Sequence, residues 1–202
     1  MQSGWFPRSL ALLIALIAWL GIVIHVVEIW SMTGSLWTAV SILGGYFTIL
    51  TNLIIAIGFT VLAVRGPAAI GASSLSGITI SIGLVGIVYG VLLQGLYVLT
   101  GGAAISNVLL HMITPVLVPI YWFFCVPRGR LRWHDPVLWA LYPLAYLVYA
   151  LVRGTAEGSF AYPFIDYVAN GIPTTVATVA IITLAFLLVG WLMVALDKRL
   201  AR

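Results

Sequence analysis

Polar side chains capable of acid–base chemistry occur in pairs within the long apolar runs of this sequence. The members of each pair are three or four residues apart, so they share one face of a helix. Their imidazole, hydroxyl, amide and carboxyl groups can donate or accept hydrogen bonds, and an imidazole can also transfer a proton near neutral pH. The pairs are His25 with Glu28, Thr48 with Asn52, and Asn107 with His111.

The elements that must position these pairs are predicted to be transmembrane helices. Of the 202 residues, 63% are hydrophobic and 7% are charged, whereas an ordinary soluble domain has about 25% charged residues. Several apolar runs reach the ~20 residues that a helix needs to cross the hydrocarbon core of a bilayer. The predicted spans are residues 9–30, 42–64, 77–99, 105–126, 135–152 and 172–196. Because every loop is short, we expect an all-α polytopic fold with a single six-helix transmembrane domain over residues 1–202.

The basic residues predict the orientation of these helices. If six helices alternate in direction, eight of the nine Lys and Arg residues fall on one side of the membrane and only Arg153 falls on the other. By the positive-inside rule, both termini are therefore expected in the cytoplasm, in a multi-pass protein of the cell membrane. We expect the basic residues to touch anionic lipid head groups and assign them no role with nucleic acid. The eight are Arg8, Arg65, Arg128, Arg130, Arg132, Lys198, Arg199 and Arg202.

Metal and redox chemistry are not indicated by the cysteine content. Cys125 is the one cysteine, and the sequence has neither a CxxC motif nor a cluster of Cys and His residues. An intramolecular disulfide is therefore impossible, and we expect no metal site and no cofactor.

With this orientation, the polar residues of all six helices fall at one depth, in the outer half of the membrane. Polar groups that face lipid are unfavourable, so their helix faces are expected to turn inward and meet. The sequence therefore predicts a pocket that opens to the outer leaflet. Besides the three pairs, the residues expected to line it are Thr51, Gln94, Tyr149, Arg153 and Asp166.

Glycines and prolines predict where helices approach closely and where they bend. Gly86 and Gly90 have the four-residue spacing that lets a neighbouring helix come near. Pro115 lacks a backbone N–H, so it is expected to free the carbonyl of His111, four residues back. An irregular turn is thus expected beside His111.

Three motifs give the chain a resemblance to a known family. It resembles the androgen-induced transmembrane hydrolases, six-helix enzymes that split fatty acid esters of hydroxy fatty acids, and their bacterial relatives. The family's human members have an acidic residue where this chain has Thr51, and a second histidine where it has Val108. The motifs are Tyr46-Phe47-Thr48, Asn107-x-x-x-His111 followed by Thr114-Pro115, and Tyr162-Pro163-Phe164-Ile165-Asp166.

The resemblance implies a threonine nucleophile at Thr48 and a histidine at His111. Because a threonine hydroxyl is a weak nucleophile, His111 is expected to act as its base on a lipid ester whose acyl chain lies in the apolar inner half. The candidate donors to the developing oxyanion are Asn52, Asn107 and Arg153, and the candidate acids that could orient a histidine are Glu28 and Asp166.

Other interpretations stay open at the level of sequence. Either Thr48 or Thr51 could face the pocket. A non-catalytic lipid carrier would use the same polar groups to bind a head group, and a haem protein would ligate iron through His25 and His111. An intramembrane serine protease of the rhomboid kind is disfavoured, because the fourth predicted helix lacks its serine and the sixth lacks its histidine.

Overall fold

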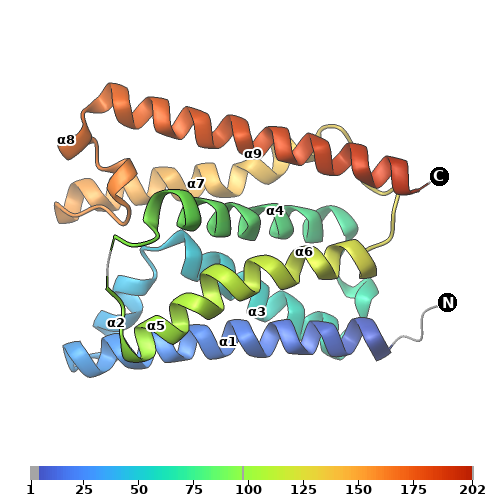
Figure 1. Cartoon of the computed structure of the whole chain (residues 1–202), viewed down its shortest axis with the longest axis horizontal. Coiled ribbons are helices and arrows are strands. Elements are labelled where there is room, and N and C mark those ends of the chain that lie inside the picture. Colours follow the sequence, from blue (N-terminus) through green and yellow to red (C-terminus); the bar gives the residue numbers. More distant parts are fainter. Residues whose placement is uncertain (1–4, 97, 202) are drawn as a thin grey trace. The chain divides into compact units, whose positions relative to one another are not determined.

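The computed structural model describes residues 5–96 and 98–201, so Arg202 of the predicted basic tail lies outside them. It is 84% helical, and the described residues contain no strand. Six of its helices are long and apolar enough to cross a membrane, which confirms the predicted all-α, six-span fold class (Figure 1). These six are Trp5–Thr33, Phe47–Arg65, Ala72–Leu93, Gly101–Cys125, Asp135–Glu157 and Ile172–Leu200.

Two of these long helices contain a π-helical turn. The third consists of α4 (Ala72–Val88) and the π turn η2 (Tyr89–Leu93). The fourth consists of α5 (Gly101–Val108), the π turn η3 (Leu109–Ile113) and α6 (Thr114–Cys125). The other four are α1 (Trp5–Thr33), α3 (Phe47–Arg65), α7 (Asp135–Glu157) and α9 (Ile172–Leu200), and the short helices are α2 (Leu36–Leu43), η1 (Pro67–Ala69), η4 (Pro163–Ile165) and α8 (Tyr167–Asn170).

The second and third helices differ in extent from the predicted spans. Residues 36–43 form the separate helix α2, which Ser35 caps by accepting a hydrogen bond from the backbone N–H of Thr38 (3.2 Å). The backbone then turns at two glycines, and α3 begins only at Phe47. The third helix ends at Leu93 rather than near residue 99, because Gly95 adopts a left-handed conformation (φ 84°) that a helix cannot continue through.

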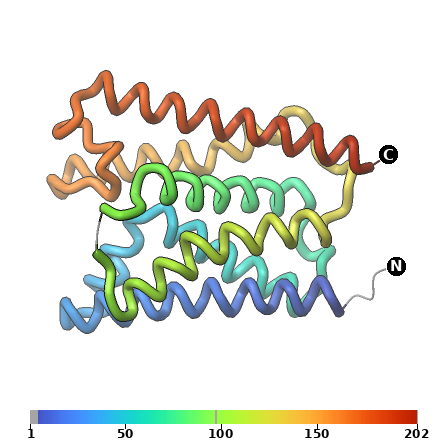
Figure 2. Tube along the Cα trace, viewed as in Figure 1, coloured from blue at the N-terminus to red at the C-terminus, as the bar shows by residue number. Residues whose placement is uncertain are grey.

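The described residues fall into two compact units, divided between Pro127 and Arg128. The single domain predicted over residues 1–202 stays a prediction. The first unit contains α1 to α6, and the second contains α7 to α9. The chain trace in Figure 2 follows this order.

In the first unit, α1 packs against α3, α5 and α6, and α4 packs against α6. Small buried residues on α1, among them Ala11, Ala18 and Gly21, allow these close approaches. A Cβ atom added at Gly21 would lie 2.5 Å from Leu110 Cδ2, so no larger residue fits there without displacing Leu110.

The predicted Gly86–Gly90 contact is only half realised. A Cβ atom at Gly86 would lie 2.8 Å from Pro115 Cβ, so this glycine does permit the approach of α6 to α4. No atom of the described residues lies within 4 Å of a Cβ atom at Gly90. The prediction is wrong for Gly90, because it lies in the π turn η2, where a widened turn alters the four-residue periodicity of the helix face.

Large apolar side chains cover much of the outer surface. Val64 is 71% exposed in the first unit, and Leu192 is 64% exposed in the second. Exposed apolar surface on this scale is typical of helices whose solvent is lipid.

Candidate functional site

The side chains of Thr48 and His111 meet inside the first unit. Thr48 is the second residue of α3, and His111 is the central residue of η3. Thr48 Oγ1 lies 3.1 Å from His111 Nε2, a hydrogen-bond distance, and Thr48 is only 5% exposed. Thr51 is also buried on α3, but the contact with the imidazole is made by Thr48. The structure therefore brings together the two residues that the family resemblance singles out.

The π turn η3 gives His111 its position and leaves a carbonyl open to another helix. The backbone N–H of Thr114 donates to the carbonyl of Leu109, five residues back. The next residue, Pro115, has no N–H. The carbonyl of Leu110 therefore lacks a donor from its own helix, and Asn52 Nδ2 of α3 donates to it instead (3.3 Å). The carbonyl that accepts a hydrogen bond from another helix is thus that of Leu110. It lies one residue before His111, whose carbonyl Pro115 was expected to free.

Asn52 holds η3 against α3 rather than offering a free donor. Its amide nitrogen also donates to the carbonyl of Thr48 (2.9 Å), so both amide hydrogens are engaged. The expectation that Asn52 donates to an oxyanion is therefore not supported. Its carbonyl oxygen, Oδ1, is buried and has no hydrogen-bond partner among the described residues.

Tyr89 completes the surroundings of the imidazole. Its ring lies 4.5 Å from that of His111, and its hydroxyl oxygen accepts a hydrogen bond from Asn107 Nδ2 (2.6 Å). Tyr89 opens the π turn η2, so both π turns of the first unit contribute a ring to this contact. Tyr89 could not be predicted from the sequence because the residues three and four positions away from it are all apolar or glycine, and only the packing reveals its partners.

His25 of α1 lies in the same region and is held by Ser106. Ser106 Oγ donates to the carbonyl of Gly21 (2.9 Å), so it can only accept from His25 Nδ1 (3.2 Å). The neutral His25 ring therefore carries its hydrogen on Nδ1, which leaves Nε2 as an acceptor. Ser106 is fully buried, and it too could not be predicted from the sequence, where nothing distinguishes it from other serines beside polar neighbours.

Among the described residues, no carboxylate contacts His111. The groups that contact its ring are the Thr48 hydroxyl, at Nε2, and the Tyr89 ring, and its Nδ1 is buried and has no hydrogen-bond partner among the described residues. Glu28 lies instead against the start of α5, where a Cβ atom at Gly102 would be 2.5 Å from its Oε2. Glu28 therefore does not contact His111, and its expected role as an acid that orients a histidine stays a prediction.

The remaining predicted pocket residues make local contacts. Gln94 is exposed just beyond η2. In the second unit, Arg153 donates to Glu157 Oε1 (2.7 Å) and to the Tyr149 hydroxyl (3.0 Å), and Asp166 caps α8 by accepting from the N–H groups of Val168 and Ala169. Their predicted place in the same pocket as Thr48 stays a prediction.

The described residues hold no group of three or more His, Cys, Asp or Glu side chains that could bind a metal ion. The nitrogens of His25 and His111 that make contacts do so with hydroxyl groups, Ser106 and Thr48 respectively. The chemistry available from these groups is proton transfer between a hydroxyl and a neutral imidazole.

Fold and site together define a multi-pass α-helical membrane protein with a partly buried hydroxyl–imidazole pair between two of its helices. Comparison of the chain with protein-family models, with curated proteins and with solved structures found no match.

Proposed function

We propose that this protein is an intramembrane lipid ester hydrolase that uses Thr48 as nucleophile and His111 as base. The observation that carries the proposal is the 3.1 Å separation of Thr48 Oγ1 and His111 Nε2. A hydroxyl needs a base within hydrogen-bond reach to become a nucleophile, and this distance satisfies that condition.

The first half-reaction forms an acyl-threonine. Thr48 Oγ attacks the ester carbonyl carbon while its proton passes to His111 Nε2. The carbon–oxygen bond to the alcohol then breaks, and the leaving alkoxide takes the proton from His111. In the second half-reaction, His111 removes a proton from water, the resulting hydroxide attacks the acyl carbon, and the free acid leaves as Thr48 regains its proton.

Tyr89 and Asn107 are the proposed donors to the oxyanion. The Tyr89 hydroxyl accepts from Asn107, so its own hydrogen is available to donate. Asn107 Nδ2 has a second hydrogen as well. Preorganised donors of this kind stabilise the charge that develops on the carbonyl oxygen in the transition state.

The proposed setting is the cell membrane, with both termini in the cytoplasm and the site in the outer half of the bilayer. Thr48 lies at the start of α3 and His25 in the last turns of α1, so the site is near the end of the first unit opposite to the start of α1. The proposed substrate is a fatty acid ester whose acyl chain lies among apolar helix faces, as the resemblance to the hydrolases of fatty acid esters of hydroxy fatty acids implies.

The test is ester hydrolysis by the purified protein in detergent, with branched and simple fatty acid esters and with labelling by a fluorophosphonate probe. Thr48→Ala and His111→Ala are expected to lower the rate by about 100-fold or more, because general-base catalysis alone contributes ~10²–10⁴-fold. Thr79→Ala is the matched control: Thr79 is equally buried, at 6% against 5% for Thr48, but its hydroxyl donates to the Leu75 carbonyl of its own helix.

Labelling of the Thr48→Ala variant at the wild-type level would contradict the assignment of the nucleophile. Stoichiometric binding of lipid without turnover, unchanged in Thr48→Ala, would indicate a lipid carrier instead. A Soret absorption band in the purified protein would indicate a haem protein.

A further inference from the structure

The segment that joins α6 to α7 carries three arginines, and we call residues 128–134 the basic strap. Its sequence is Arg-Gly-Arg-Leu-Arg-Trp-His. The strap belongs to the second unit, together with the C-terminal turns of α9 against which it lies. It is independent of the site around Thr48.

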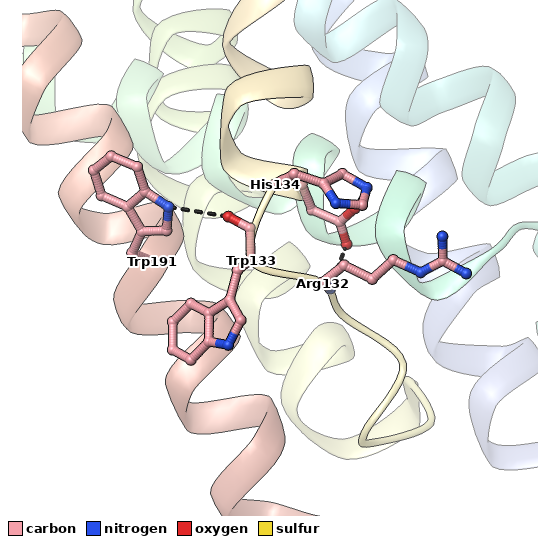
Figure 3. Close-up of polar contacts among 5 residues, drawn as sticks. Arg132, Trp133, His134 and Trp191 are labelled. Atoms are coloured by element: carbon pink, nitrogen blue, oxygen red, sulfur yellow. Dashed lines mark hydrogen bonds and ion pairs between the residues drawn. The ribbon is translucent and has the colours of Figure 1, made fainter.

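Alternate residues of the strap attach it to α9. A Cβ atom at Gly129 would lie 2.9 Å from Ala201 Cβ. The buried Leu131 donates its backbone N–H to Asp197 Oδ2 (3.0 Å). The carbonyl of Trp133 accepts from Trp191 Nε1 (3.1 Å), as Figure 3 shows. The strap is thus hydrogen-bonded to the helix at Leu131 and Trp133 and passes close to the end of the helix at Gly129.

The residues between these anchors face outward. Arg130 and Arg132 are exposed, and neither guanidinium has an ion-pair or hydrogen-bond partner among the described residues. Lys198 and Arg199 of α9 add positive charge beside them, with Lys198 Nζ 5.8 Å from the centre of the Trp133 ring. The two arginine side chains are therefore accessible to solvent on a segment whose backbone is held.

The acidic groups nearby are committed to the backbone. Asp197 is 1% exposed and accepts from Leu131, while Asp135 is 4% exposed and accepts from the backbone N–H of Arg132 (2.9 Å; Figure 3). Their carboxylates thus hold the shape of the strap and leave Arg130 and Arg132 without a counter-ion. Arg128 is half-buried, and burial lowers its pKa while the nearby Asp197 acts in the opposite direction.

We propose that the basic strap is a binding site for the head groups of anionic phospholipids. Guanidinium groups suit phosphate because their fork of N–H donors matches two of its oxygens. The strap lies at the ends of membrane helices, and Trp133, which is 57% exposed, is of the residue type enriched at the membrane–water interface. A lipid head group at that interface is therefore favoured over a soluble polyanion.

The test measures binding of short-chain phosphatidylglycerol to the full-length protein in a neutral detergent. Phosphatidylcholine of the same chain length, inorganic phosphate and a single-stranded DNA oligonucleotide serve as comparison ligands. The double variant Arg130→Gln with Arg132→Gln is expected to weaken phosphatidylglycerol binding roughly 30-fold, because each basic residue near an anionic surface contributes a factor of about five. The matched control, Arg8→Gln with Arg65→Gln, also removes two exposed positive charges, and because neither arginine belongs to the strap it is expected to weaken binding clearly less than the strap pair does.

A third variant distinguishes a binding site that depends on the position of the strap from an effect of net charge alone. Trp191→Phe keeps every arginine but removes the hydrogen bond that fixes Trp133, so it is expected to weaken phosphatidylglycerol binding. The proposal is overturned if phosphatidylcholine binds as tightly, if the control pair weakens binding as much as the strap pair, or if Trp191→Phe has no effect. Equal binding of phosphate would indicate a soluble-anion site, and tighter binding of DNA would indicate a nucleic-acid surface.

Discussion

At the scale of single residues, the pair formed by Thr48 and His111 differs from a soluble hydrolytic triad in having no carboxylate beside its histidine among the described residues. The Nδ1 atom of His111 is buried and has no hydrogen-bond partner there. An ionised carboxylate at that position would be strongly unfavourable among apolar helices. The ring is held instead by the Thr48 hydroxyl and by the Tyr89 ring, whose hydroxyl accepts from Asn107.

Tyr89→Phe tests the proposed oxyanion donor. The substitution keeps the ring that contacts His111 and removes the hydroxyl, so it is expected to lower kcat by about 100-fold, as the loss of one oxyanion donor does elsewhere. KM is expected to change little, because the hydrogen bond forms mainly in the transition state. Tyr46→Phe, a change of the same chemistry on the residue before α3, serves as the control, and an equal loss of kcat in both variants would remove Tyr89 from the mechanism.

At the scale of elements, two π turns and one proline set the geometry of the site. The π turn η3 and Pro115 together leave the Leu110 carbonyl to Asn52, and this bond holds η3 beside α3. Pro115 also packs on Gly86, so the same proline fixes α6 against α4. Such turns are frequent at functional sites because they offer backbone groups that a regular helix would occupy.

Gly86→Ala and Gly90→Ala form a matched pair that tests this packing. At Gly86 the added methyl group would lie 2.8 Å from Pro115, so overpacking is expected to lower the stability by about 1–3 kcal/mol. At Gly90 the methyl group meets nothing within 4 Å, and stability is expected to stay unchanged or to rise slightly. Thermal unfolding in detergent measures both, and equal melting temperatures would show that α4 and α6 do not depend on this contact.

At the scale of the whole molecule, six spans would place both termini on one side of the membrane. The nine Lys and Arg residues divide eight to one between the two predicted sides, which favours the cytoplasm for the termini. With this proposed orientation, the basic strap would lie on the cytoplasmic side, where anionic lipids are enriched.

Reporter fusions test this orientation. Green fluorescent protein, which does not fold when exported unfolded, is expected to fluoresce when fused after residue 202, and alkaline phosphatase to stay inactive there. Alkaline phosphatase inserted after Gly158, in the loop after α7, is expected to be active. The reverse pattern would invert the topology and move the site around Thr48 to the inner half of the bilayer.

The sequence by itself determined the class of fold and the number of membrane spans. Both follow from local composition, because apolar runs such as residues 172–196 are long enough to span a bilayer whatever they pack against. Spacing within one helix also showed that Asn107 and His111 share a face. What the sequence could not give were relations between helices, such as the choice of Thr48 over Thr51 and the contacts of Tyr89 and Ser106.

Only the tertiary structure decided those relations. Asn52 uses one of its two amide hydrogens to reach the carbonyl of Leu110 on another helix. That carbonyl is free because the π turn shifts the hydrogen-bonding pattern by one residue, to Pro115, which has no N–H. Gly86 and Gly90 look equivalent in sequence, yet a neighbour reaches only one of them. Contacts of this kind depend on how helices rotate and approach one another, and the periodicity of a single helix carries no information about either.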